Sequence, residues 1–439
     1  MIRLRNARLL TMEPATGEIA QGWVAIDGGR IAALGAGDPP SPAPGDRDED
    51  MAGDLLMPGF VNTHAHLAMT LFRGLGEDVD DRLSRYILPL ERALVTADVV
   101  EAGTRLAALE TIRAGVTTVA DMYYHEDRVG AVLDAAGLRG LLGQTLADFA
   151  APDHRGWDEG FARLDALHDR YRDHPRLRAS AAPHAPYSTG PKALARVAAW
   201  AADHPEARVQ MHLAETRDEL AWARREHGGT TVEVVRDAGL LGPRLTAAHV
   251  MYPTEGDMDL LAASGAGVAH NPRSNGKAGR GVAPVAALRA RGVPVGLGTD
   301  GPMSGNTLDL FAQMAPAAMF ARIRAGTRTA MPAAEVVRMA TLGGAEALGM
   351  AGEIGSLAPG KRADLARIRT TDPRWRPLHD VHAALVYAAL PTDVRATMVE
   401  GRWLMRDREV LTLEAPRALA EAEQVAERFR LRLSALEGT

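Results

Sequence analysis

Short apolar segments alternate with alanine-rich segments from Pro58 to about residue 300, and this alternation restricts the fold more than any other feature. The apolar segments are strand-like, whereas the segments between them have helical composition. Such alternation, sustained over about 250 residues, predicts a parallel α/β fold, and the length suits an eight-stranded (β/α)8 TIM-type barrel. The clearest strand candidates are 117–121, 207–212, 246–249, 267–270 and 293–300.

The two ends of the chain have strand patterns of a different kind. Residues 4–34 alternate like a small β unit with a hairpin signal at Asp27-Gly28-Gly29, residues 36–53 are rich in Pro, Gly and Asp and are typical of a loop, and the β pattern returns at 360–368 and 396–405. Neither end has enough strands to bury a face, so we expect both ends to join in one small β-sandwich beside the barrel. The predicted parts are residues 1–57 (sandwich), 58–356 (barrel) and 357–439 (sandwich, with an amphipathic helix at about 415–436).

Polar side chains occur where the predicted barrel strands end, which is the side of a barrel on which active sites lie. A single histidine at a strand end usually has only a structural role. It is improbable that every one of these polar residues is there for a separate structural reason, because each lies at the same end of its predicted strand. Residues two apart on a strand face the same side, and neutral imidazole is a common ligand of divalent cations. A metal site is therefore predicted among His64, His66, His184, His212 with Glu215, His249 and Asp300.

Composition narrows the chemistry and the partners. The chain has no cysteine, so a metal must be held by histidine and carboxylate. The net charge of −6, with both signs interspersed, argues against a nucleic-acid partner and favours a small-molecule substrate. The N-terminus lacks a signal-peptide pattern and no stretch approaches the roughly 20 apolar residues of a membrane span, so we expect no membrane association and a cytoplasmic location.

Several motifs together resemble the amidohydrolase superfamily. The closest similarity is to its aminohydrolase branch, which includes 5′-methylthioadenosine/S-adenosylhomocysteine deaminases and triazine hydrolases. The motifs are His64-x-His66, Met211-His-Leu-Ala-Glu-Thr216, Ala247-Ala-His-Val250, His270-Asn-Pro-Arg-Ser-Asn275, Gly298-Thr-Asp-Gly301 and Gly360-Lys-Arg-Ala-Asp364.

The resemblance implies that His64, His66, His212 and Asp300 ligate one metal ion. Binuclear members carry a bridging carboxylated lysine on a mid-barrel strand, whereas no lysine of this chain ends a predicted strand in that region, so a single ion is expected. Zinc is expected, with Fe²⁺ or Mn²⁺ as alternatives, because three imidazoles and a carboxylate do not discriminate strongly among them.

The residues suggest how such a site would work. A bound cation lowers the pKa of its water from about 16 toward 7, so hydroxide is available to attack an aromatic C–NH₂ carbon. Glu215, three residues beyond a ligand, would act as general acid and base, carrying protons to the ring nitrogen and the departing amine. His249 and Asp300 would orient or deprotonate the nucleophile, and His249 would also polarise the attacked carbon's substituent.

Substrate contacts follow from the same resemblance. Glu91 aligns with a glutamate that contacts ribose hydroxyls, although a helix-start charge is the alternative, and His184 aligns with another substrate contact. An arginine expected in the strand 140–145 is replaced by Gln144, with Arg155 as a candidate for a nearby role, which puts S-adenosylhomocysteine in doubt. The loop 274–281 adds Lys277 and Arg280, which either meet an anionic substrate or are solvated charges.

The leading hypothesis is a metal-dependent hydrolase of non-peptide carbon–nitrogen bonds that deaminates an adenine nucleoside (adenosine, 5′-methylthioadenosine or S-adenosylhomocysteine) or a related aminated heterocycle. An alternative keeps the site but changes the ring or the leaving group, as in triazine hydrolases and in guanine or pterin deaminases. A third, a catalytically silent scaffold, predicts missing ligands, and none is missing. Many relatives form dimers or tetramers, so a homo-oligomer is also an expectation.

Overall fold

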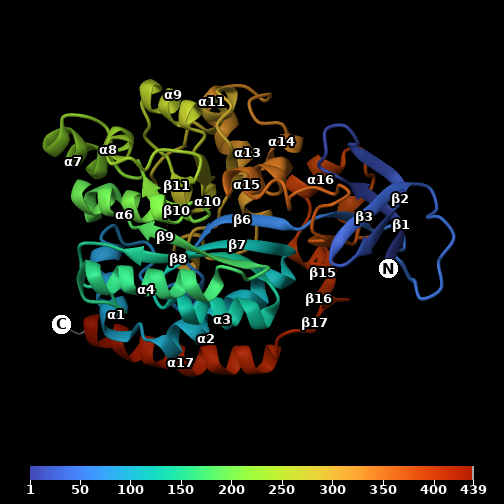
Figure 1. Ribbon diagram of the computed structural model, residues 1–439, viewed down its shortest axis with the longest axis horizontal. Helices are drawn as coiled ribbons and strands as arrows, with labels where there is room; N and C mark the ends of the chain where they lie inside the picture. Colours follow the sequence, from blue (N-terminus) through green and yellow to red (C-terminus); the bar gives the residue numbers. More distant parts are fainter. Residues whose placement is uncertain (438–439) are drawn as a thin grey trace.

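The computed structural model describes residues 1–437 and has two parts, a parallel barrel and a mixed sheet made from both chain ends (Figure 1). In Figure 1, β1, β2 and β3 lie to the right of the barrel, and the long C-terminal helix α17 (Ala415–Glu437) runs along its lower side against α2 (Ala97–Arg113). Within the described residues, no helix is both long and apolar enough to span a membrane.

Eight parallel strands form the barrel in chain order, which confirms the predicted fold class. Its seam lies between the first strand and the segment after the last one: Ala65 bridges Asp300, and the Thr299 N–H donates to the His64 carbonyl at 3.1 Å. The strands are almost entirely buried because both faces are covered, as expected of a parallel sheet. They are β6 (Phe60–Ala65), β7 (Val116–Tyr123), β8 (Arg139–Leu146), β9 (Leu177–Pro183), β10 (Arg208–Leu213), β11 (Leu245–His249), β12 (Gly267–His270) and β13 (Val295–Leu297).

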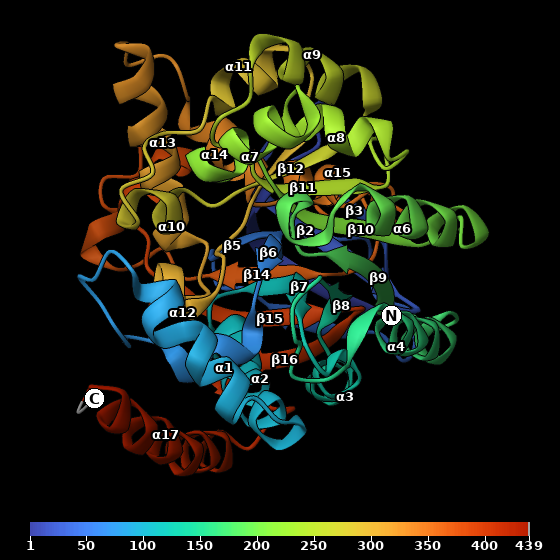
Figure 2. The ribbon, with the colours of Figure 1, turned by 90° about the vertical axis from the view of Figure 1, so that its left-hand side faces the viewer.

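Helices surround the barrel strands (Figure 2), and the segments that connect each strand to the helix after it begin at the C-terminal ends of the strands. Capping boxes at Thr230 and Thr254 fix the starts of two of them, because each threonine and the acidic residue three positions later satisfy free N–H groups reciprocally. The outer helices, besides α2, are α3 (Glu126–Ala136), α4 (Gly156–Tyr171), α6 (Pro191–Asp203), α7 (Arg217–His227), α8 (Thr231–Asp237), α9 (Glu255–Ser264), α11 (Val285–Ala290), α13 (Phe311–Ala325), α14 (Ala333–Met339) and α15 (Leu342–Ala347). Shorter elements near the strand ends are η1 (Leu67–Phe72), η2 (Leu83–Ile87), α1 (Leu88–Leu94), α5 (Pro186–Thr189), α10 (Pro272–Lys277) and α12 (Pro302–Gly305).

The two chain ends join beside the barrel, as expected. In the mixed sheet β14 lies between β5 and β15, so strands from the two ends are hydrogen-bonded neighbours. The strands are β1 (Ile2–Leu10), β2 (Glu18–Asp27), β3 (Arg30–Ala36), β4 (Arg47–Asp50), β5 (Leu55–Pro58), β14 (Leu365–Ile368), β15 (Val394–Val399), β16 (Arg402–Arg406) and β17 (Glu409–Val410). The remaining elements are η3 (Pro373–Trp375), α16 (Val381–Tyr387) and η4 (Pro391–Asp393). The exact domain limits remain a prediction.

One strand, β4, lies where the sequence predicts only a loop. Its four residues, Arg47-Asp-Glu-Asp50, pair in parallel with β1 and are mostly exposed. Backbone pairing at a sheet edge requires no apolar side chain, so the hydrophobic pattern gives no signal for it.

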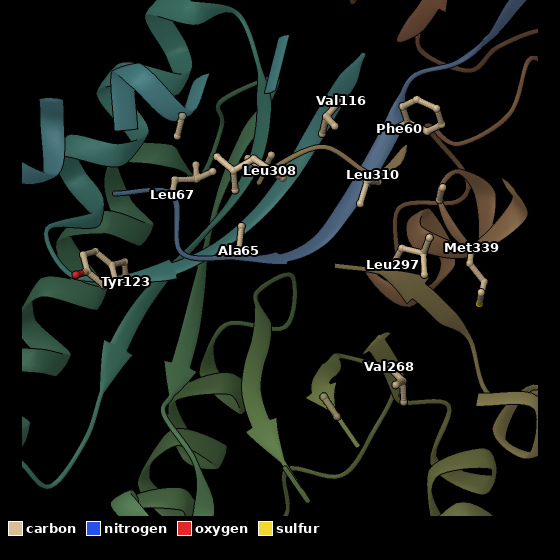
Figure 3. Packing of buried hydrophobic residues seen from close by; sticks show 14 of the residues in the cluster. Phe60, Ala65, Leu67, Val116, Tyr123, Val268, Leu297, Leu308, Leu310 and Met339 are labelled. Carbon is tan, nitrogen blue, oxygen red and sulfur yellow. The ribbon is translucent and has the colours of Figure 1, made fainter. Parts of the chain in front are cut away.

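The main core fills the space between the barrel strands and the helices. Figure 3 shows part of it, with Phe60 and Ala65 on β6 and with Val116 and Tyr123 at the two ends of β7. Tyr123 therefore belongs both to the core and to the C-terminal end of the barrel strands.

A buried ionic network joins the mixed sheet to the barrel. Arg139, at the start of β8, donates to both carboxylate oxygens of Asp364 (2.8 and 3.3 Å), and both side chains are only 2% exposed. Asp364 also accepts the Glu400 N–H at 2.9 Å, and the Glu400 carboxylate accepts from Arg139 at 3.3 Å. The Gly360–Asp364 motif is thus a structural link, remote from the predicted site.

Replacing Asp364 with Asn should destabilise the protein by about 3 to 5 kcal/mol, because it leaves the Arg139 charge buried without a full partner. Chemical unfolding followed by circular dichroism measures the loss. Asp407→Asn is the matched control: it breaks the exposed pair with Arg395 and should cost less than about 1 kcal/mol. Equal effects of the two substitutions would contradict the assigned role of the buried network.

Candidate active site and metal centre

The predicted metal ligands converge at the C-terminal end of the barrel. His64 lies near the end of β6, His66 directly follows it, His212 is on β10, and Asp300 follows β13 at the seam. The His66 Nε2 lies 3.3 Å from Asp300 Oδ1 and 3.4 Å from His212 Nε2, and the His64 Nε2 lies 3.9 Å from Asp300 Oδ1. One ligand atom each from His64, His66 and His212 lies within 4.8 Å of the others, and the same holds for His64, His249 and Asp300.

Hydrogen bonds outside this cluster fix the orientation of the imidazoles. His66 Nδ1 donates to the Met122 carbonyl at 2.5 Å, and His212 Nδ1 donates to the His184 carbonyl at 2.9 Å. Because a carbonyl only accepts, Nδ1 must carry the hydrogen, and the Nε2 of each ring points its lone pair into the cluster in the neutral form. This is the usual way in which proteins orient a metal-binding histidine.

The chemistry of the donor set fits a divalent cation. The Nε2 atoms of His64 and His249 are buried and have no hydrogen-bond partner among the described residues, a costly state that a bound cation relieves. Burial lowers the pKa of His212 to about 3 and holds that of His64 well below 6.5, so both are neutral ligands. Burial also opposes the charged form of His66, but its hydrogen bond to Asp300 outweighs this and raises the pKa of His66 to about 9; a cation must displace that proton.

Two side chains that the sequence analysis did not single out support Asp300 and His249. The Ser274 hydroxyl donates to Asp300 Oδ2 at 2.6 Å, and Asn275 Oδ1 accepts from His249 Nδ1 at 2.8 Å. Both belong to the His270–Asn275 motif. The motif could have drawn attention to Ser274 and Asn275, but it did not indicate a role for either residue. Gly298 is required nearby, because a Cβ there would lie 2.3 Å from Asn271 Oδ1.

The strand ends at the site have strained backbone. Ala214, His249, Val250 and Asp300 all have φ between 44° and 75°, a region that costs energy for residues with a Cβ. Such residues cluster at functional sites, where the surrounding structure holds them in place. The backbone conformation therefore marks this end of the barrel independently of the chemistry of its side chains.

Glu215 lies beside this cluster. Its Oε1 is 3.7 Å from His249 Nε2 and forms an ion pair with Arg280, while its N–H donates to Glu219 at 2.8 Å. Burial alone would raise the pKa of Glu215, but electrostatic interactions with His249 and with the Arg280 guanidinium outweigh it and lower the pKa to about 2. The carboxylate is therefore ionised and able to accept a proton.

A cavity of about 320 Å³ connects these groups. His66, His212, Glu215, His249 and Asp300 line its base, so all of them are accessible to one small molecule. Apolar side chains line its walls, as is usual for small-molecule sites: Met69, Ile87, Leu88, Met122, Phe149 and Met303.

Two of the predicted substrate contacts lie in this cavity. Glu91 on α1 is buried and accepts a hydrogen bond from the Tyr123 hydroxyl at 2.8 Å; burial raises the pKa of Glu91 to about 7. His184, after β9, shares a hydrogen bond with the Ser188 hydroxyl at 2.8 Å, and burial lowers the pKa of His184 to about 4.

The other two predicted contacts lie outside the cavity lining. The buried Gln144 amide donates to Asp153 at 3.1 Å, and Arg155 is exposed at the start of α4. Of the two loop cations, Lys277 pairs with Glu77 at 2.6 Å outside the cavity lining, and Arg280 lines the cavity.

Comparisons with known proteins agree with this arrangement. The model of the amidohydrolase family matches residues 55–404. A 5-methylthioadenosine/S-adenosylhomocysteine deaminase from Syntrophobacter fumaroxidans is 40% identical over 429 residues, covering 96% of this chain and 97% of the relative. A 5′-deoxyadenosine deaminase from Methanosarcina mazei is 38% identical over 437 residues, covering 99% of both chains.

Solved structures have the same fold. An adenosine deaminase from Xanthomonas campestris with bound zinc has a TM-score of 0.94 at 35% identity and covers 98% of both chains. Atrazine chlorohydrolase from Arthrobacter aurescens, complexed with zinc, has a TM-score of 0.91 at 23% identity and covers 97% of this chain and 100% of its own.

Proposed function

The chain belongs to the amidohydrolase family, and we propose that it is a metal-dependent deaminase that hydrolyses the C–NH₂ bond of an adenine nucleoside and releases ammonia. The observation that carries this proposal is one cavity whose lining includes His66, His212 and Asp300 of the ligand cluster, Glu215 beside them, and Glu91. Zinc is the expected ion, held by His64, His66, His212 and Asp300, and both zinc-bound structures described above support it.

Each polar group of the cavity has its own role in the proposed reaction. A bound cation supplies a nucleophile near neutral pH by lowering the pKa of water. Glu215 would accept a proton from the attacking water and deliver it to the ring nitrogen, and it would then take a second proton, from the hydroxyl added to the attacked carbon, and deliver that one to the departing amine. His249, fixed by Asn275, faces Glu215 and orients the attacked carbon.

The wall of the cavity favours a nucleoside with a neutral 5′ group. Glu91, on α1, accepts hydrogen bonds from ribose hydroxyls, and His184, which follows β9, also contacts the substrate. The lining residues Ile87 and Leu88, which precede Glu91 in the chain, and Phe149, which packs on His184, are apolar, and the exposed Arg92 also lines the cavity. Since Gln144 and Arg155 are outside the lining, we propose that 5′-deoxyadenosine, 5′-methylthioadenosine and adenosine are better substrates than S-adenosylhomocysteine.

The proposal is tested by measuring ammonia release by zinc-loaded protein. The panel of substrates contains these four nucleosides, guanine, a pterin and an aminotriazine. Chloride release from a chlorotriazine is measured in parallel. Turnover of adenine nucleosides, with kcat/KM lowest for S-adenosylhomocysteine, is the expected result. Turnover of a triazine or pterin alone would favour the alternative leaving group or ring. The cytoplasmic location and the homo-oligomeric state stay predictions.

The KM for a nucleoside should depend on pH through Glu91. Its pKa of about 7 means that the carboxylate is protonated below pH 7 and loses an acceptor for the ribose hydroxyls, so KM should fall as the pH rises from 6 to 8. Glu91→Gln should raise KM at pH 8 by about 10- to 100-fold, the effect of losing hydrogen bonds to a charged group. Steady-state kinetics of both proteins across this range measure it. The same pH dependence of KM in Glu91→Gln would assign the titration to another group.

A further inference from the structure

Most polar side chains at the base of the cavity have a second anchor in the barrel. His66 and His212 are held by backbone carbonyls, His249 by Asn275, and Asp300 by Ser274 and by the Gly301 N–H at 2.7 Å. These contacts hold the side chains in fixed positions at the strand ends. Catalysis depends on such fixed positions, because a catalytic group must lie at the right distance from the reacting atom.

The Glu215 carboxylate has its anchor elsewhere. Within residues 1–437 the structure gives it one hydrogen-bonded partner, the Arg280 guanidinium, whose Nη1 contacts Oε1. His249 Nε2, at 3.7 Å, is beyond hydrogen-bond distance. The Glu215 main chain, in contrast, is fixed by Glu219, which accepts the N–H groups of Ala214 and Glu215 at 2.9 and 2.8 Å.

The backbone of Arg280 is itself rigidly mounted. Its N–H donates to the Asn275 carbonyl at 3.0 Å, and its carbonyl accepts a hydrogen bond from the Tyr252 hydroxyl. The flanking glycines, Gly279 and Gly281, have φ of +64° and +92°, which turns the chain sharply on both sides of the arginine. Arg280 therefore lies in the segment after β12, which also carries Asn275, and it is tied through Tyr252 to the segment after β11, the strand that ends at His249.

The two loop cations differ in what they contact. Lys277 pairs with Glu77 and Asn306, outside the cavity lining. Arg280 lines the cavity, its side chain is 31% exposed, and its guanidinium forms an ion pair with the Glu215 carboxylate. This contact distinguishes Arg280 from a solvated loop charge.

We propose that Arg280 is a positioning residue that holds the Glu215 carboxylate in the orientation in which it exchanges protons with the substrate ring. The proposal rests on the proposed function, because it assumes that Glu215 is the proton carrier. An arginine suits the task, since its planar guanidinium fixes the direction of a carboxylate as well as its charge.

Kinetics of Arg280→Ala, in zinc-loaded protein, test this proposal. The substrate is whichever compound of the panel the wild type deaminates. We expect kcat to fall by about 10- to 100-fold, the scale of misplacing a catalytic group by about 1 Å, while KM changes less than about threefold. Added guanidinium ion should restore part of kcat, and Arg280→Lys should be intermediate. Lys277→Met, on the same loop, is the matched control and should keep kcat within about threefold of the wild type.

Several results would overturn the proposal. A rise in KM at constant kcat would make Arg280 a substrate contact, and unchanged kinetics would make it a surface charge. A loss of kcat without rescue by guanidinium, in Arg280→Ala and in the more conservative Arg280→Gln, would indicate a purely structural role. A wild type that deaminates no nucleoside would contradict the proposed function instead, and the ratio of variant to wild-type kcat on another panel compound would still decide the role of Arg280.

Discussion

Replacing Glu215 with Gln should lower kcat by about 10²- to 10⁴-fold, the usual contribution of general acid–base catalysis, while the protein keeps its metal. The amide has nearly the shape of the carboxylate but cannot accept a proton from water or deliver one to the ring. The ligand cluster should be unaffected, because Glu215 contacts Arg280 and lies near His249, whereas His66, His212 and Asp300 are held by other residues.

Ammonia release and metal content by atomic emission, measured on the same preparation, test this expectation. Glu226→Gln is the matched control, since Glu226 lies on the adjacent helix α7 and, among residues 1–437, pairs only with exposed Arg225. If the metal content fell together with kcat, Glu215 would be a ligand and its assignment as the proton carrier would be wrong.

Removing the metal should abolish turnover by more than about 10³-fold, because the uncatalysed nucleophile, water with a pKa of about 16, is scarcely ionised at neutral pH. Dialysis against a chelator followed by addition of Zn²⁺, Fe²⁺ or Mn²⁺ measures the loss and shows which ion restores the rate. Each restoring ion should also raise the Tm, since a ligand that binds only the folded state stabilises it.

His66→Ala should have the same effect on activity and should also prevent the rescue by Zn²⁺, because it removes a ligand at the centre of the cluster. His227→Ala is the control, with an exposed imidazole packed on Trp222. Full activity of thoroughly chelated protein would exclude the metal-dependent mechanism.

The residues that could be predicted from sequence are those whose chemistry coincides with a strand end. His64, His66, His212, His249 and Asp300 each follow a strand-like segment, and a parallel barrel necessarily brings such positions together. The alternation of strands and helices could also be predicted, because each strand or helix is indicated by a pattern among residues that are neighbours in the sequence.

The parts that could not be predicted depend on contacts through space. Arg280 meets Glu215 across 65 residues and Ser274 meets Asp300 across 26, and no periodic pattern encodes either distance. Gln144 illustrates the opposite case: its position in the sequence suggested a substrate contact, but its amide points to Asp153, a partner that only the folded loop after β8 supplies.

The seam of the barrel determines when the protein becomes functional during its synthesis. Asn62 and Thr299, 237 residues apart, hydrogen-bond to each other beside His64 and Asp300, so the complete ligand set exists only after the last barrel strand has left the ribosome and docked. One partner strand of β5, β14 at residues 365–368, emerges later still, whereas its other partner, β1, is made first. We therefore expect high-affinity metal binding only after the barrel has closed, since Asp300 is the last of the four expected ligands along the chain.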